Sequence, residues 1–145
     1  MKRAKRLEPV QQIVDDAQRR LAHSVAAFEK RVLDGETKLQ ELQRYKSEYE
    51  QQFAQRAGRG IGATELRDYQ VFLARLSEAI KQQQALVTRA NAEHQAERVK
   101  WQQALTRSKA LGHVVDRWQA EERHMNDRRD QREGDERAQR KVDRP

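Results

Sequence analysis

The sequence predicts an all-α protein: a long antiparallel two-helix coiled coil with unequal arms and a charged C-terminal overhang. Two observations carry this prediction. Apolar residues recur at alternating spacings of three and four over two long stretches, and a glycine-rich segment separates them. Such spacing puts apolar side chains on one narrow helix face that packs against another helix. Composition agrees, because 37% of the residues are charged and only 36% hydrophobic. Disorder is the competing interpretation of so polar a chain.

The first helix is predicted from about Pro9 to about Ala57, since proline suits a first helical turn, where its missing N–H costs no hydrogen bond. Its main seam is a series with a period of seven: Leu7, Val14, Leu21, Phe28, Gly35, Leu42 and Tyr49. A second seam series is expected to begin with Val10 and Ala17 and then to shift register, as happens where a straight helix slips against a 3.5-residue repeat. After the shift it continues as Val25, Val32, Leu39 and Phe53.

The segment Gly58-Arg59-Gly60-Ile61-Gly62 is the predicted turn (58–62), because each glycine inside a helix costs about 1 kcal/mol. The second helix is predicted over 63–140, with Thr64 as its N-cap and Glu65 beside the positive helix end. One of its seam series is Leu66, Leu73, Ile80, Val87, His94, Trp101, Ser108 and Val115. The other is Tyr69, Leu76, Gln83, Ala90, Glu97, Ala104, Leu111, Trp118 and Met125.

The two arms differ in length, and the difference predicts an overhang. In a hairpin that turns at Gly60, facing residues have numbers that add to about 120, so residues after Trp118 have no partner within the chain. The tail 126–145 is expected to fray, because isolated charged helices are marginally stable. Residues 1–145 are expected to form one coiled-coil domain.

Catalytic and metal chemistry find little support, so we expect no enzyme, no cofactor and no metal. The chain has no cysteine, phosphate-binding glycine loop or nucleophile elbow. Glu121-x-x-His124 matches half of a di-iron motif, yet such sites need two of these motifs and two further carboxylates. His94, Gln83 and Ser108 are interpreted as polar layers that set the register of the seam.

The net charge of +7 is spread along the chain. A nucleic-acid-binding protein usually concentrates such charge in a patch, and here acidic residues interrupt nearly every basic run. No apolar run follows the basic residues 2–6, and none is long enough to span a membrane, so a cytoplasmic location is expected. Two alternatives stay open: a basic coiled coil that binds nucleic acid, and a structural coiled coil that assembles with itself.

Near the turn, the chain has more apolar residues than a two-helix seam needs. The additional positions, which flank the seam, are Tyr45, Phe72, Ala79 and Leu86. Contiguous exposed apolar surface of this kind indicates a docking site. Alternatively, these side chains wrap over the seam and thicken a short coiled coil.

These same stretches are similar to a known family. The run Leu42-Gln43-Arg44-Tyr45-Lys46-Ser47-Glu48-Tyr49 resembles the Leu-x-x-Tyr-x-x-x-Tyr segment of the flagellar export protein FliJ family. The stretch 66–76, followed by Ala79-Ile80, resembles the opening of that family's second helix, and Trp101 and the tail with Gln131, Asp135 and Glu136 also fit. The similarity covers essentially the whole chain.

The resemblance implies a non-enzymatic stalk and adaptor of the bacterial flagellar type III export apparatus. Members of this family form a two-helix coiled coil similar to the paired terminal helices of the rotary ATP synthase gamma subunit. They bind the export ATPase FliI, promote its hexameric ring, contact the cytoplasmic domain of the gate protein FlhA, and have been assigned the escort of export chaperones. The resemblance thus implies a cytoplasmic protein at the inner face of the cell membrane, attached only through partners, and no nucleic acid.

The resemblance also implies two binding regions. The gate-binding patch maps onto Leu42, Tyr45, Tyr49, Phe72, Leu76 and Ala79. Lys38 and Gln83 occupy neighbouring positions but differ from the commonest family residues. The ATPase-facing region is expected where both termini lie, with the candidate residues Lys2, Arg3, Lys5 and Arg6.

Overall fold

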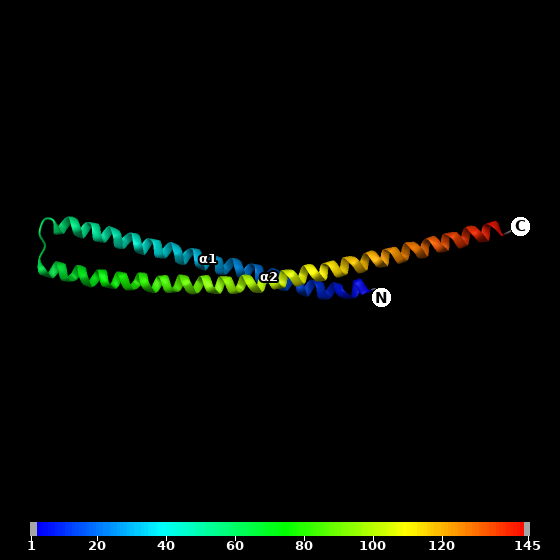
Figure 1. Ribbon diagram of the computed structural model, residues 1–145, viewed down its shortest axis with the longest axis horizontal. Coiled ribbons are helices and arrows are strands. Elements are labelled where there is room, and N and C mark those ends of the chain that lie inside the picture. Colours follow the sequence, from blue (N-terminus) through cyan, green and yellow to red (C-terminus); the bar gives the residue numbers. More distant parts are fainter. Residues whose placement is uncertain (1–2, 144–145) are drawn as a thin grey trace. The chain divides into compact units, whose positions relative to one another are not determined.

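The computed structural model describes residues 3–143, which form two α-helices joined by a short loop (Figure 1). Helix α1 comprises Arg3–Ala57 and helix α2 comprises Ala63–Val142. The two helices pack against each other as a helical hairpin, and the described residues contain no strand. The predicted all-α hairpin is therefore confirmed.

Contacts divide the hairpin into two units, each of which pairs a segment of α1 with a segment of α2. The loop unit comprises Leu21–Lys100, and the terminal unit comprises the described parts of Met1–Arg20 and Trp101–Pro145. Each unit has its own cross-helix hydrogen bonds. In the loop unit the Ser24 hydroxyl donates to the Glu97 carboxylate at 2.8 Å, and in the terminal unit the Ser108 hydroxyl donates to the Asp15 carboxylate. That residues 1–145 form a single domain stays a prediction.

The loop is built from its glycines. The Gly60 amide donates to the Ala57 carbonyl at 3.1 Å, and Gly60 has a φ of 91°, a left-handed conformation that side chains disfavour. The Leu66 amide donates to the Gly62 carbonyl at 3.1 Å, so Gly62 is the N-cap of α2. The N-cap predicted at Thr64 was wrong, because the hydrogen bond from the Leu66 amide to the Gly62 carbonyl starts α2 at Ala63. Thr64 and Glu65 lie in the first helical turn.

Most predicted seam positions are buried or half-buried. Every member of the series from Leu7 to Tyr49 is half-buried, and Val32, Leu76 and Val115 are the most deeply buried large apolar side chains. The exceptions are Leu66 and Met125, which lie at the ends of the α2 series, and Val10 on α1; all three are exposed. Few side chains are fully buried, as expected for only two helices.

The predicted register shift in the second α1 series was wrong. Val10 is 46% exposed, whereas Gln11 and Gln18 are half-buried in the seam. A polar residue can occupy this position because the Trp101 indole N–H donates to Gln18 Oε1 at 3.1 Å. One unbroken series with a period of seven results: Ala4, Gln11, Gln18, Val25, Val32, Leu39, Lys46 and Phe53.

The two helices also differ from expectation at their outer ends. Helix α1 begins at Arg3, before the predicted start at Pro9, because Ala4 packs against α2 and is only 2% exposed. Helix α2 continues to Val142 with residues 127–143 exposed throughout, and the expected fraying of the tail stays a prediction. Within the described residues, neither helix has a stretch apolar enough to cross a membrane.

Candidate functional site

Five aromatic rings gather in the loop unit, next to the turn. We call this group the aromatic cluster: Tyr45, Tyr49 and Phe53 from α1, with Tyr69 and Phe72 from α2. Phe53 stacks on Tyr69 with ring centroids 3.5 Å apart, and Tyr49 lies 4.5 Å from Phe72. Tyr45 meets Phe72 edge-on at 6.1 Å. Aromatic pairs of this kind contribute about 0.5–1.5 kcal/mol each beyond their burial.

Heptad positions explain how the cluster forms. Tyr49, Phe53 and Tyr69 are seam residues, so the antiparallel pairing brings them into contact. Tyr45 lies four residues before Tyr49, and Phe72 three residues after Tyr69, which places both just outside the seam on the same edge of the hairpin. The 6.1 Å contact between Tyr45 and Phe72 marks that edge.

The six predicted gate-binding residues differ in solvent exposure. Tyr45 is 50% exposed, whereas Leu76 is only 7% exposed and belongs to the seam. The other four, Leu42, Tyr49, Phe72 and Ala79, are half-buried. Leu86, one heptad beyond Ala79, is 57% exposed on the same helix. The edge thus offers exposed apolar area at Tyr45 and Leu86, whereas Leu76 is buried in the seam.

Tyr69 is the titratable group that the cluster perturbs. Partial burial raises the pKa of the Tyr69 phenol above its ordinary value, and the negative charge of Glu50 and the neighbouring Tyr49 raise this pKa further. Glu50 in turn lies 3.9 Å from the Lys46 ammonium. Tyr69 is therefore uncharged at neutral pH and suited to stacking.

Lys38 and Gln83, which flank the predicted patch, differ in solvent exposure. Lys38 is exposed, whereas Gln83 is 7% exposed and its Nε2 donates to the Gly35 carbonyl at 3.0 Å. Gln83 thus forms a polar layer inside the loop unit. The helices approach closely here, because a β carbon on Gly35 would lie 3.2 Å from Cγ2 of Val87.

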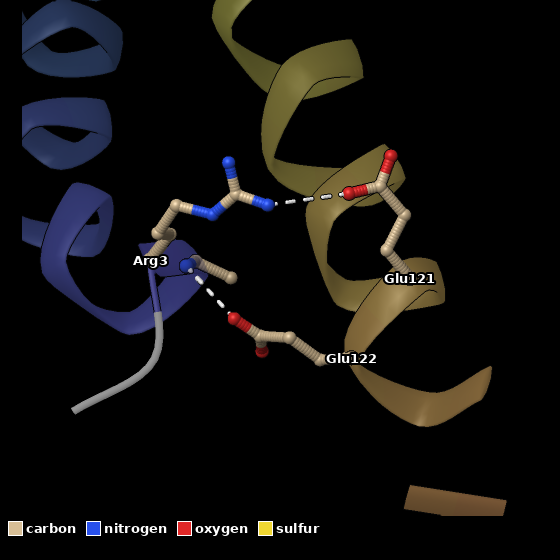
Figure 2. A network of polar contacts seen from close by, with 4 residues as sticks. Arg3, Glu121 and Glu122 are labelled. Atoms are coloured by element: carbon tan, nitrogen blue, oxygen red, sulfur yellow. Dashed lines mark hydrogen bonds and ion pairs between the residues drawn. The ribbon is translucent and has the colours of Figure 1, made fainter. Parts of the chain in front are cut away.

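In the terminal unit, α1 is tied to α2 by a group of residues that we call the terminal clasp: Arg3, Ala4, Trp118, Glu121 and Glu122. Figure 2 shows Arg3 beside Glu121 and Glu122. Arg3 Nη2 lies 3.4 Å from Glu121 Oε2, and its guanidinium lies 4.8 Å from the Trp118 ring centroid. The Ala4 amide donates to Glu122 Oε1 at 3.4 Å. Glu122 thereby satisfies one of the free amides of the first turn and places negative charge at the positive end of α1.

The basic residues predicted to face the ATPase differ in their contacts. Arg3 contacts Glu121 and Trp118 within the chain, whereas Lys5 and Arg6 are exposed on the outer surface of α1. Lys2 lies outside the described residues. The pairing rule placed the start of α1 near this part of α2, yet sequence reasoning missed the roles of Trp118 and Glu122. No motif indicates a side chain that caps another helix.

Glu121 therefore has an ion-pairing partner. Glu121 and His124 match half of a di-iron motif, but α1 supplies no second Glu-x-x-His motif. Within residues 3–143, no group of three or more His, Asp or Glu side chains is placed to hold a metal ion.

The chain matches a known protein family. The family model for FliJ, described as "Flagellar FliJ protein", matches residues 2–145. No curated protein matches the chain. No solved structure matches it.

Proposed function

Because the chain belongs to the flagellar FliJ family, and so to the components of the flagellar protein export apparatus, we propose that it is a non-enzymatic adaptor with two binding surfaces. The loop unit binds the cytoplasmic domain of the export gate protein FlhA, and the terminal unit binds the export ATPase FliI and promotes its hexameric ring. The adaptor would then act in the cytoplasm at the base of the flagellum, attached to the membrane only through these partners.

The observation that carries the gate-binding proposal is the exposed edge of the aromatic cluster. Tyr45 is 50% exposed although it contacts Phe72, so it combines a fixed position with free area. Rigid aromatic side chains of this type dominate the binding energy of many interfaces. The exposed Leu86 extends the apolar edge along α2.

The proposal for the ATPase rests on charge and on the terminal clasp. Lys5 and Arg6 are exposed on a helical turn that Ala4 and Glu122 hold in place. Cations on a fixed helix attract an acidic partner and set the orientation in which it docks. The proposed adaptor would also escort export chaperones.

Gate binding is tested by the double substitution Tyr45→Ala and Phe72→Ala. We expect affinity for the FlhA cytoplasmic domain to fall by at least about thirtyfold, as for a typical hot spot, with stimulation of FliI ATPase activity retained. The matched control is Leu33→Ala, which removes a side chain that is 55% exposed in the same unit. Calorimetric titration measures the affinity, and circular dichroism measures the helix content.

Two results would count against this assignment. If the double variant loses its helix content, the two rings are core residues of the hairpin. If it stays helical and binds the gate domain as tightly as the Leu33→Ala control, the docking surface lies elsewhere.

A further inference from the structure

The terminal unit carries a second apolar surface, which lies outside the seam. Val10 is 46% exposed, Ile13 is 66% exposed and Ala17 is half-buried. Their spacings of three and four residues place them in one stripe along α1. Because Gln11 and Gln18 occupy the seam, Val10 and Ile13 stay largely exposed.

Helix α2 adds to the stripe along one edge of the unit. The contact between Arg3 and Glu121 shows which positions face each other on this edge (Figure 2). Seven residues along each helix from the Arg3–Glu121 pair, the antiparallel pairing puts Val10 beside Val114. Fourteen residues along from that pair, it puts Ala17 beside Arg107. Val114 is half-buried, so it continues the apolar area from α1 onto α2.

Arginine side chains surround this apolar area. Arg6 and Arg20 lie at the two ends of the stripe on α1, and Arg107 and Arg117 lie beside it on α2; all four are exposed. Two acidic residues in the same stretches are paired, Glu121 with Arg3 and Asp16 with Arg19.

The other edge of the same unit carries both acidic and basic side chains. Glu8, Asp15 and Arg19 line one surface depression there, and Asp15 accepts a hydrogen bond from Ser108.

We propose that this stripe, formed by Val10, Ile13, Ala17 and Val114, binds an amphipathic helix of a partner protein that has acidic residues beside its apolar face. Apolar positions at spacings of three and four select a helix, and the four arginines select Asp and Glu at its flanks. A second copy of this chain is a poor occupant, because docking the same surfaces would bring the arginines of one copy against those of the other. The proposed surface is separate from the aromatic cluster, and it shares Arg6 with the surface proposed for the ATPase.

A designed peptide tests this proposal with the full-length protein. The probe is a fluorescent helical peptide of about 21 residues with Leu at heptad positions a and d and Glu at positions e and g, and its control carries Lys in place of Glu. We expect saturable binding of the Glu peptide by fluorescence anisotropy, and no binding of the Lys peptide. Affinity should fall roughly tenfold or more in Ile13→Gln and in the double variant Arg20→Glu and Arg107→Glu.

Leu33→Gln is the matched control, because Leu33 is similarly exposed but belongs to the loop unit. It should bind the peptide like the unmodified chain. Failure of the Glu peptide to bind would overturn the proposal, as would binding that Ile13→Gln leaves unchanged. A doubling of mass in sedimentation equilibrium that Ile13→Gln abolishes would instead identify a second copy as the occupant.

Discussion

At the scale of single residues, Gly35 shows how one position fixes the distance between the helices. A β carbon there would lie 3.2 Å from Cγ2 of Val87, and the Gly35 carbonyl accepts the hydrogen bond of the buried Gln83. Glycine inside a helix costs about 1 kcal/mol relative to alanine. Gly35 has this cost, but it lets the two helices approach closely where an alanine side chain would crowd Val87.

This balance predicts coupling between Gly35→Ala and Val87→Ala. Alone, Gly35→Ala should stabilise the hairpin by less than its propensity gain of about 1 kcal/mol, because the stiff β-branched Val87 must give way. In a chain that already carries Val87→Ala, Gly35→Ala should gain the full amount, a coupling of about 0.5–1 kcal/mol. Denaturant unfolding followed by circular dichroism measures all four free energies. Strictly additive effects would show that the contact carries no strain.

The raised pKa of Tyr69 predicts that the folding stability depends on pH. The pKa of its phenol is raised in the folded chain, so folding favours the neutral form. The associated stability is present below the ordinary tyrosine pKa of about 10 and is lost as the pH rises through the higher folded value. Tyr69→Phe should therefore flatten the decline of the unfolding free energy above that pH, as measured by thermal melts across alkaline buffers. An unchanged pH profile would mean that Tyr69 ionises normally.

At the scale of elements, the terminal clasp determines where α1 begins. The Glu122 carboxylate accepts from the Ala4 amide, whereas the Glu121 carboxylate makes an ion pair whose side chains are 52% and 65% exposed. Exposed ion pairs contribute little, while an N-terminal cap is worth about 0.5–2 kcal/mol. The two neighbouring glutamates thus have different roles in holding the first turn of α1.

We therefore expect Glu122→Ala to accelerate hydrogen exchange at the amides of residues 4–7 more than Glu121→Ala does. Global stability should change less than this local opening, because the clasp holds only the end of the helix. Mass-spectrometric exchange after proteolysis resolves the segment, and Glu133→Ala in the exposed tail serves as the control. A larger effect from Glu121→Ala would assign the first turn of α1 to the ion pair instead of the cap.

The sequence predicted the elements well where a simple pattern governs them. The period of seven located both helices and most seam positions, and the glycines located the turn. The second α1 series was wrong because the prediction followed apolarity, while the structure places Gln18 in the seam and satisfies it with Trp101. Periodicity also identified Tyr45 and Phe72 as positions that flank the seam, but it did not predict their contact. It could not identify the clasp, because a capping carboxylate far away in the sequence leaves no local pattern.

At the scale of the whole molecule, the chain presents different chemistry on its two units. The loop unit exposes aromatic and aliphatic area at Tyr45 and Leu86, and the terminal unit exposes Lys5 and Arg6. Apolar hot spots mainly determine how long a complex lasts, whereas exposed charges mainly determine how fast it forms. The proposed adaptor thus joins two partners through surfaces that differ in chemistry and can be altered separately.

The most direct test of this account is a crossed binding measurement. One variant carries Tyr45→Ala and Phe72→Ala, the other carries Lys5→Glu and Arg6→Glu, and each is titrated with the FlhA cytoplasmic domain and with FliI. We expect the first variant to lose only the gate protein and the second to lose only the ATPase. A variant that loses both partners while it stays helical, or two variants that lose neither, would contradict the assignment of two separate binding surfaces.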